Sequence, residues 1–278
     1  MTKVIAVSGA SGHLGGGVAR ALSAAGAPTV LIGRDPARLP DLPGATARRG
    51  SFGDPVLGEA LDGVDTFVMV SATETRDRAD LQRAAVDCAA AAGVRRIVYV
   101  SFVGAAPDCT FTFGRDHWHT EQRVRESGLA FTFLRDNLYL DLMPGMVGPD
   151  GVIRGPAGDG RAAMVARADA VAVAAAVVRS PDYDGETLDL TGPAALSLHE
   201  VAAALTSVSV EAITYLPETV DEAYASRASY GAQQWEVDGW VSSYRAIAAG
   251  DLARVSGDVA RVLGRAPLGI ADVLRPRS

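Results

Sequence analysis

Short, continuous apolar runs alternate with amphipathic stretches along the first half of the chain. Runs of this kind, each followed by glycine or small polar residues, are typical of strands buried on both faces of a parallel sheet. Six strands are predicted, at residues 4–8, 28–33, 45–49, 66–70, 96–101 and 131–134. Helical periodicity predicts helices at residues 14–25, 55–61, 78–92 and 120–127. This alternation predicts an α/β fold, a doubly wound parallel sheet with right-handed crossovers.

The rhythm changes after residue 136, where glycines and prolines gather in a turn-rich stretch. Further on, Asp169 is predicted to cap a helix that runs to residue 178, residues 187–190 form a strand, and Ser197 with Glu200 form a capping box. We therefore predict two parts. Residues 1–135 form the core, and residues 136–278 form a smaller C-terminal α/β lobe, some segments of which return to the sheet.

Composition narrows the class of protein. The 278 residues are 48% hydrophobic and 21% charged, as in an ordinary globular protein, and the net charge of −7 disfavours a nucleic-acid-binding surface. The two cysteines form no C-x-x-C pair, so neither a disulfide framework nor a metal site is predicted. The chain has no apolar run of membrane-spanning length, and its first strand begins too early for a signal peptide. A cytoplasmic protein without a membrane partner is expected.

A glycine-rich turn follows the first predicted strand and opens the first helix. The segment Gly9-Ala-Ser-Gly-His-Leu-Gly15 has the spacing G-x-x-G-x-x-G. Glycines there permit a tight turn, close approach of backbone N–H groups to a pyrophosphate, and close packing of helix on strand. The sequence therefore predicts a Rossmann-type site for a dinucleotide, with the cofactor-binding residues Gly9, Ser11, Gly12, His13, Leu14 and Gly15.

The end of the second strand distinguishes the two nicotinamide cofactors. An acidic residue there accepts a hydrogen bond from the ribose of NAD, whereas an arginine binds the 2′-phosphate of NADP. Arg34 occupies this position, and the Asp35-Pro36 pair that follows is predicted to cap a short helix. The sequence therefore predicts NADPH. Ser71, Ala72 and Thr73, at the end of the fourth strand, have small side chains where the backbone passes the cofactor.

Longer motifs resemble those of the NmrA-like family of atypical short-chain dehydrogenases/reductases, and among its members the bacterial NADPH:quinone reductases. The resemblance covers nearly the whole chain and is loosest between about residues 215 and 250. The motifs that carry it are IAVSGASGHLG from Ile5, GRDPAR from Gly33, GVD from Gly63, AAGVRRIVYVS from Ala91, His117-x-x-Thr-Glu, Leu134-Arg-x-Asn, GPAGDG from Gly155 and Arg167-Ala-Asp. The resemblance implies an NADPH site lined by the glycine turn, Arg34, the residues around Ser71 and Asn137, without a tightly held flavin.

The usual acid–base pair of short-chain dehydrogenases is absent. Those enzymes use a serine with Tyr-x-x-x-Lys, but Lys3 is the only lysine of this chain and lies at the first strand. Ser101 matches the usual serine, and His117 and Glu121 stand where the tyrosine and lysine would be. Three interpretations remain open for His117. It acts as a general acid oriented by Glu121, it binds a planar acceptor, or it forms a structural pair with Glu121 on one helix face.

The missing pair also limits the chemistry. Quinones are strongly electrophilic, and water or a weak acid can protonate the hydroquinone, so their reduction needs mainly orientation and exclusion of water. We therefore predict an NADPH-dependent oxidoreductase that reduces a quinone or a similar conjugated acceptor. The alternative is a non-catalytic NADP(H)-sensing regulatory protein of the NmrA type. Candidates for the acceptor pocket are Tyr139, Trp235 and Trp240; a homodimer is left open.

Overall fold

The computed structural model describes residues 3–275, and the ends of the two predicted parts, residues 1–2 and 276–278, lie outside the described residues. Seven strands form one sheet in the order β3-β2-β1-β4-β5-β6-β9. The paired strands whose register is defined are parallel: Ile5 of β1 lies opposite Thr29 of β2 and Thr66 of β4, and Thr66 lies opposite Arg96 of β5. The strands are Ile5–Ser8 (β1), Thr29–Gly33 (β2), Ala45–Arg49 (β3), Thr66–Val70 (β4), Arg96–Phe102 (β5), Ala130–Asp136 (β6) and Thr187–Leu190 (β9).

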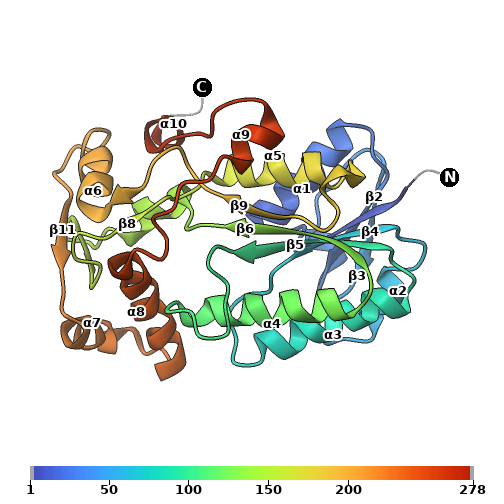
Figure 1. Cartoon of the computed structure of the whole chain (residues 1–278), viewed down its shortest axis with the longest axis horizontal. Helices are drawn as coiled ribbons and strands as arrows, with labels where there is room; N and C mark the ends of the chain where they lie inside the picture. The colour runs from blue at the N-terminus through green and yellow to red at the C-terminus, as the bar shows by residue number, and fades with distance from the viewer. Residues whose placement is uncertain (1–2, 276–278) are drawn as a thin grey trace. The chain divides into compact units, whose positions relative to one another are not determined.

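Helices cover both faces of this sheet (Figure 1). One face is covered by α1 and α5, and the other by α2, α3 and α4. Their bounds are His13–Ala24 (α1), Val56–Ala60 (α2), Arg78–Ala91 (α3), Thr112–Glu126 (α4) and Arg167–Val177 (α5). The core between the layers is built from side chains with no exposed surface, among them Phe67, Ile97 and Phe133. The predicted doubly wound parallel sheet is confirmed.

The described chain divides into two compact units. The first comprises the chain up to residue 107 together with residues 116–135 and 170–188; the second comprises residues 108–115, 136–169 and 189 onward. In the second unit, Val152–Gly155 (β7) pairs with Thr214–Pro217 (β11), and Arg161–Ala162 (β8) pairs with Leu196–Ser197 (β10). Its helices are Leu198–Thr206 (α6), Val220–Arg227 (α7), Gln234–Ala249 (α8), Asp258–Leu263 (α9) and Ile270–Leu274 (α10).

Local signals placed several helix starts correctly. The carboxylate of Asp35 accepts a hydrogen bond from the N–H of Ala37 at 3.0 Å, which confirms the predicted cap of the 3-10 turn Pro36–Arg38. The capping box of Ser197 and Glu200 is also present at the start of α6. These caps depend only on neighbouring residues, which is why the sequence reveals them.

Two predicted helix starts were wrong, because tertiary contacts set them. Helix α4 begins at Thr112, about two turns before the predicted residue 120, and the N–H of Thr112 donates to Ser242 at 3.1 Å. Gly114, a poor helix former, hides this first turn in the sequence. Asp169 does not cap α5, which begins at Arg167; its buried carboxylate instead accepts from the N–H of Leu268 at 2.6 Å and from Arg265 at 2.7 Å.

Candidate functional site

The glycine turn lies where the strand order of the sheet reverses. Strand β1 has β2 on one side and β4 on the other, and ligands of doubly wound sheets bind at the carboxyl ends of strands at such a switch point. Gly9, with φ of +61°, makes the sharp exit from β1. The N–H of Gly12 donates to the carbonyl of Gly9 at 2.9 Å and closes the turn.

Gly15 lets the first turn of α1 lie directly on the end of β1. A Cβ atom at this position would stand 2.5 Å from the carbonyl oxygens of both Ser8 and Gly9, so no larger residue fits without a shift of the backbone. Helix α1 has no side-chain cap and no acidic residue in its first turn. Its first N–H groups and the positive end of its dipole are therefore available to an anion, as a pyrophosphate site requires.

The other turn residues leave this backbone accessible. Ser11, Gly12 and His13 are exposed, and Leu14 is half-buried. Ser8, at the end of β1, accepts from the N–H of Val70 at 2.9 Å and ties β1 to the end of β4. The predicted residues of the turn thus form one continuous surface with the segment that follows β4.

Arg34 follows β2 and is exposed, and its guanidinium has no hydrogen bond or ion pair within residues 3–275. Arg38 is also exposed, one turn further along. Because Asp35 is engaged as a cap, no carboxylate neutralises Arg34. A cation without a partner beside a dinucleotide turn fits the 2′-phosphate of NADPH.

Buried Gln82 of α3 supports the segment Ser71-Ala72-Thr73. Its Oε1 accepts from the N–H of Ala72 at 3.1 Å, and its Nε2 donates to the hydroxyl of Thr120 at 2.9 Å. Sequence reasoning missed Gln82. The signal was a polar residue on the buried face of an amphipathic helix, where unpaired amides are costly. Ser71 and Ala72 are half-buried and Thr73 is exposed, so this segment borders the surface beside the glycine turn.

His117 is buried, and its interaction partner differs from the one predicted. Its Nδ1 shares a hydrogen bond of 2.9 Å with the hydroxyl of Tyr99 on β5, and its ring lies 6.1 Å from that of Phe102. Burial, followed by the nearby charges of Arg78 and Arg135, holds the pKa of His117 well below its ordinary value. The imidazole is neutral at neutral pH, so it does not match the first interpretation, a general acid that titrates near working pH.

Glu121 and Ser101 form a separate, saturated network. The carboxylate of Glu121 has no exposed surface and binds Arg135 through both oxygens, at 2.8 and 2.7 Å, while Ser101 donates to it at 2.7 Å. Within the described part of the chain, no hydrogen bond or ion pair joins Glu121 to His117. The contacts do not match the interpretation in which Glu121 orients His117: two arginines, Arg135 and the more distant Arg125, attract its charge instead.

Asn137 follows β6 and is buried. Its Nδ2 donates to the carbonyl of Leu252 at 3.0 Å, and its Oδ1 accepts from the N–H of Leu138 at 2.7 Å. Both polar groups of the side chain thus hold backbone within the second unit. This arrangement fits a residue that positions the loop after β6 better than one whose side chain grips the cofactor.

The three predicted acceptor residues have different surroundings. Trp240 lines a cavity of about 670 Å³ in the second unit, together with Tyr230 and Tyr244, whereas Trp235 and Tyr139 are not among its lining residues. Trp235 packs edge-on against Phe113, with ring centroids 6.0 Å apart. Tyr139 instead donates a hydrogen bond to Asp136 and lies under the guanidinium of Arg167.

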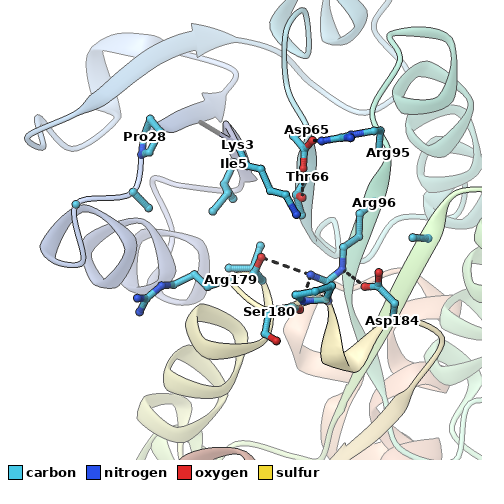
Figure 2. A pocket seen from close by; sticks show the side chains of 15 residues that line it. Lys3, Ile5, Pro28, Asp65, Thr66, Arg95, Arg96, Arg179, Ser180 and Asp184 are labelled. Carbon is cyan, nitrogen blue, oxygen red and sulfur yellow. Dashed lines mark hydrogen bonds and ion pairs between the residues drawn. The ribbon is translucent and has the colours of Figure 1, made fainter. Parts of the chain in front are cut away.

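A second cavity, of about 460 Å³, lies in the first unit, at the edge of the sheet where β1, β4 and β5 begin (Figure 2). Arg96, at the start of β5, points into it and is held by the protein: Nη1 donates to the carbonyl of Ser180, Nη2 donates to the hydroxyl of Thr132, and Nε lies 2.7 Å from Asp184 as an ion pair without hydrogen-bond geometry. This arginine ties strand β5 to the segment that follows α5, and we assign it a structural role.

The described residues contain no group of three or more His, Cys, Asp or Glu side chains placed to hold a metal ion. Between residues 3 and 275, no helix combines the length and the apolarity that crossing a bilayer requires.

Comparison with known proteins shows that this chain is similar to proteins that bind NAD(P)H. The profile of a family described as NAD(P)H-binding matches residues 9–181. Quinone oxidoreductase 2 of Escherichia coli (strain K12) is 31% identical, with 97% of this chain and 96% of that protein aligned. The NAD(P)H azoreductase of Xenophilus azovorans is 30% identical over 94% of this chain and 93% of its own length.

A solved structure agrees over the same extent. The crystal structure of the NADPH-dependent quinone oxidoreductase QOR2 from Escherichia coli, complexed with NADPH, superposes with a TM-score of 0.88 at 31% identity. It covers 96% of this chain and 97% of that chain. The similarity therefore extends through both units and is not limited to the glycine turn.

Proposed function

This chain belongs to the NAD(P)H-binding family that these matches define, and on that premise we propose that it is an NADPH-dependent reductase of quinones or similar conjugated acceptors. The observation that carries the proposal is the extent of the similarity: 97% of the chain aligns with a quinone oxidoreductase. The absence of Tyr-x-x-x-Lys agrees with it, since a quinone needs less acid assistance than an ordinary carbonyl.

The proposed cofactor site is built from the first unit. The glycine turn and the N-terminus of α1 hold the pyrophosphate, Arg34 binds the 2′-phosphate, and the segment from Ser71 to Thr73 borders the cofactor. When bound, NADPH supplies the hydride. We propose that residues 1–135 act as the cofactor-binding core and residues 136–278 as the lobe that holds the acceptor, with residues 170–188 returning to the first unit.

The buried polar groups near α4 have a supporting role in this proposal. Tyr99 hydrogen-bonds to Nδ1 of His117, and Ser101 and Arg135 hydrogen-bond to Glu121, so these contacts hold α4 against β5 and β6. This corresponds most closely to the structural interpretation of these residues. A homodimer and a cytoplasmic location stay predictions of the sequence.

The proposal is tested by following NADPH absorbance while the purified protein is mixed with a panel of quinones and azo compounds. Steady oxidation of NADPH with at least one acceptor is the expected result. Binding of NADPH and NADP⁺ with similar affinities, without turnover on any acceptor, would contradict the reductase and favour the sensor. Isothermal titration of both cofactor forms measures those affinities on the same sample.

A further inference from the structure

At the end of β6 lies a pair formed by a carboxyl group and a phenol, which has no role in the function proposed above. Asp136 is the last residue of the strand, with only 3% of its surface exposed. The hydroxyl of Tyr139, three residues further along, donates a hydrogen bond to its Oδ2. The other oxygen, Oδ1, is buried and has no hydrogen-bond partner within residues 3–275. Tyr139 is half-buried as a whole residue, and its hydroxyl lies against the enclosed carboxyl of Asp136.

The surroundings of the pair favour protonated forms of both groups. A carboxylate with one buried, unpartnered oxygen is costly, and a neutral carboxylic acid relieves that cost. Burial raises the pKa of Asp136 to about 7, and burial together with the charge of Asp136 holds the pKa of Tyr139 well above its ordinary value. Two further charged groups face the phenol: the Arg167 guanidinium, 5.3 Å from the ring centroid, and the carboxylate of Asp141.

The reaction is accelerated by a group of this kind, although a quinone needs less acid assistance than an ordinary carbonyl. A quinone that has received a hydride carries a negative charge on an oxygen, and a proton must reach that oxygen to complete the hydroquinone. Short-chain dehydrogenases supply the proton through a tyrosine assisted by lysine. This chain has no such lysine, but it has a tyrosine assisted by a carboxylic acid at the carboxyl end of a sheet strand, the edge at which ligands of these folds bind.

We propose that Tyr139 donates the proton to the reduced acceptor, and that Asp136 positions the phenol and restores its proton. The inference rests on the proposed reductase function and deepens it. The acceptor gains two electrons and one hydrogen from NADPH. The O–H bond of Tyr139 then breaks and its proton bonds to the acceptor oxygen, the proton of Asp136 passes to the phenolate, and solvent returns a proton to Asp136.

The arrangement has a pH dependence with a defined sign. Below about pH 7 the carboxyl of Asp136 is protonated, so it donates to the Tyr139 oxygen and leaves the phenol hydrogen for the acceptor. Above that pH the carboxylate accepts the phenol hydrogen and withholds it. Quinone turnover therefore falls as pH rises through about 7. Asp136→Asn removes the titrating group, so it abolishes this step in the pH profile and lowers turnover at pH 6.

The first variant is Tyr139→Phe, with Tyr224→Phe as its matched control. Tyr224 belongs to a second tyrosine–aspartate pair in the same unit, since its hydroxyl donates to Asp238 at 2.9 Å. With 1,4-benzoquinone, Tyr139→Phe is expected to lower kcat by about 10- to 100-fold, the low end of general-acid effects because the acceptor is electrophilic. Tyr224→Phe keeps the wild-type kcat. Circular dichroism and NADPH affinity check that both variants fold.

A carbocationic acceptor separates proton donation from binding or packing. A triarylmethane dye cation or N-methylacridinium becomes neutral on receiving a hydride and needs no proton. Tyr139→Phe therefore retains the wild-type rate with such a cation and loses rate only with the quinone. Equal losses with both acceptors, or an unchanged rate with the quinone, would overturn the inference. If wild type reduces neither cation, the pH profile of Asp136→Asn decides: a retained step near pH 7 overturns it.

The two levels of the proposal fail in different ways. Wild-type protein that oxidises no NADPH with any acceptor overturns the reductase itself, and the proton-donor assignment falls with it. Wild-type protein that is active beside an equally active Tyr139→Phe overturns the assignment alone.

Discussion

We propose that the charge of a single residue, Arg34, sets the preference for NADPH. Arg34 is exposed and unpaired within the described residues, and its neighbour Asp35, which a ribose hydroxyl would otherwise attract, has its carboxylate committed to the Ala37 N–H. Both facts follow from local sequence: an Asp-Pro pair is a cap signal, and the preceding arginine then remains free. We therefore propose that the preference for NADPH originates at Arg34.

Arg34→Glu is expected to weaken NADPH binding by about 10- to 100-fold, because it removes a charge-assisted hydrogen bond worth about 1.5–3 kcal/mol and adds repulsion. NADH, which lacks the phosphate, should lose less than about threefold on the same grounds. Fluorescence titration of the reduced nicotinamide measures both affinities. Arg179→Glu is the matched control, an exposed charge reversal at the amino-terminal edge of the sheet. Equal losses for the two cofactors would refute the assignment of Arg34.

Other predicted site residues have partners in the structure that differ from those suggested by the sequence. The sequence placed His117 and Glu121 on one helix face, four residues apart, and in two of the three interpretations left open they contact each other. In the structure Tyr99 of β5 takes the imidazole, and Arg135 of β6 takes the carboxylate. Partners of this kind come from strands that are distant in sequence, so spacing along one helix could not reveal them. The same limit hid the engagement of the Asn137 side chain with Leu252.

At the scale of elements, the contact of α1 with β1 forms the cofactor turn. The sequence predicted six of the seven sheet strands from the first 136 residues, and β9 from residues 187–190. The buried strands β1, β2, β4 and β5 are continuous in their hydrophobicity, whereas β3, with the sequence Ala-Thr-Ala-Arg-Arg, has no buried residue. The start of α4 could not be predicted in the same way, since a contact with Ser242 fixes it.

Gly15→Ala tests the close packing of α1 on β1. The added Cβ would meet two carbonyl oxygens at 2.5 Å, so the turn must open. We expect a loss of about 1–3 kcal/mol in the free energy of unfolding, typical of overpacking, together with weaker NADPH binding. Gly257→Ala meets nothing within 4 Å and serves as the control in urea titrations. Unchanged stability and affinity for Gly15→Ala would show that the turn does not need this contact.

Arg96→Met tests the tie at the amino-terminal edge of the sheet. Arg96 is buried, and its loss leaves the carbonyl of Ser180 and the carboxylate of Asp184 without this partner. We expect about 2–4 kcal/mol of destabilisation, less than for a fully enclosed pair because Asp184 is partly exposed. The neighbouring Arg95 is an exposed partner of Asp65, and its change to Met should lower the free energy of unfolding by less than about 1 kcal/mol. Equal costs would contradict the structural role of Arg96.

In the whole molecule, the proposed cofactor residues and the candidate acceptor residues belong to different units. The first unit contains the proposed cofactor residues, and motifs near the start of the chain predict nearly all of them. The second holds the acceptor candidates and the pair of Asp136 and Tyr139. The residues that line its cavity come from three separate segments: 145–154, 226–230 and 240–244. A local sequence pattern therefore does not predict this cavity. Acceptor specificity is accordingly the property that sequence reasoning predicts least well.

The central claim is that this chain transfers hydride from NADPH to a quinone. The most direct measurement compares kcat/KM for NADPH and NADH in parallel, with the purified wild-type protein and saturating 1,4-benzoquinone. We expect turnover with both cofactors and a specificity constant at least about tenfold higher for NADPH, the equivalent of roughly 1.4 kcal/mol from Arg34. Equal constants would contradict the cofactor assignment, and the absence of turnover with either cofactor would contradict the reductase.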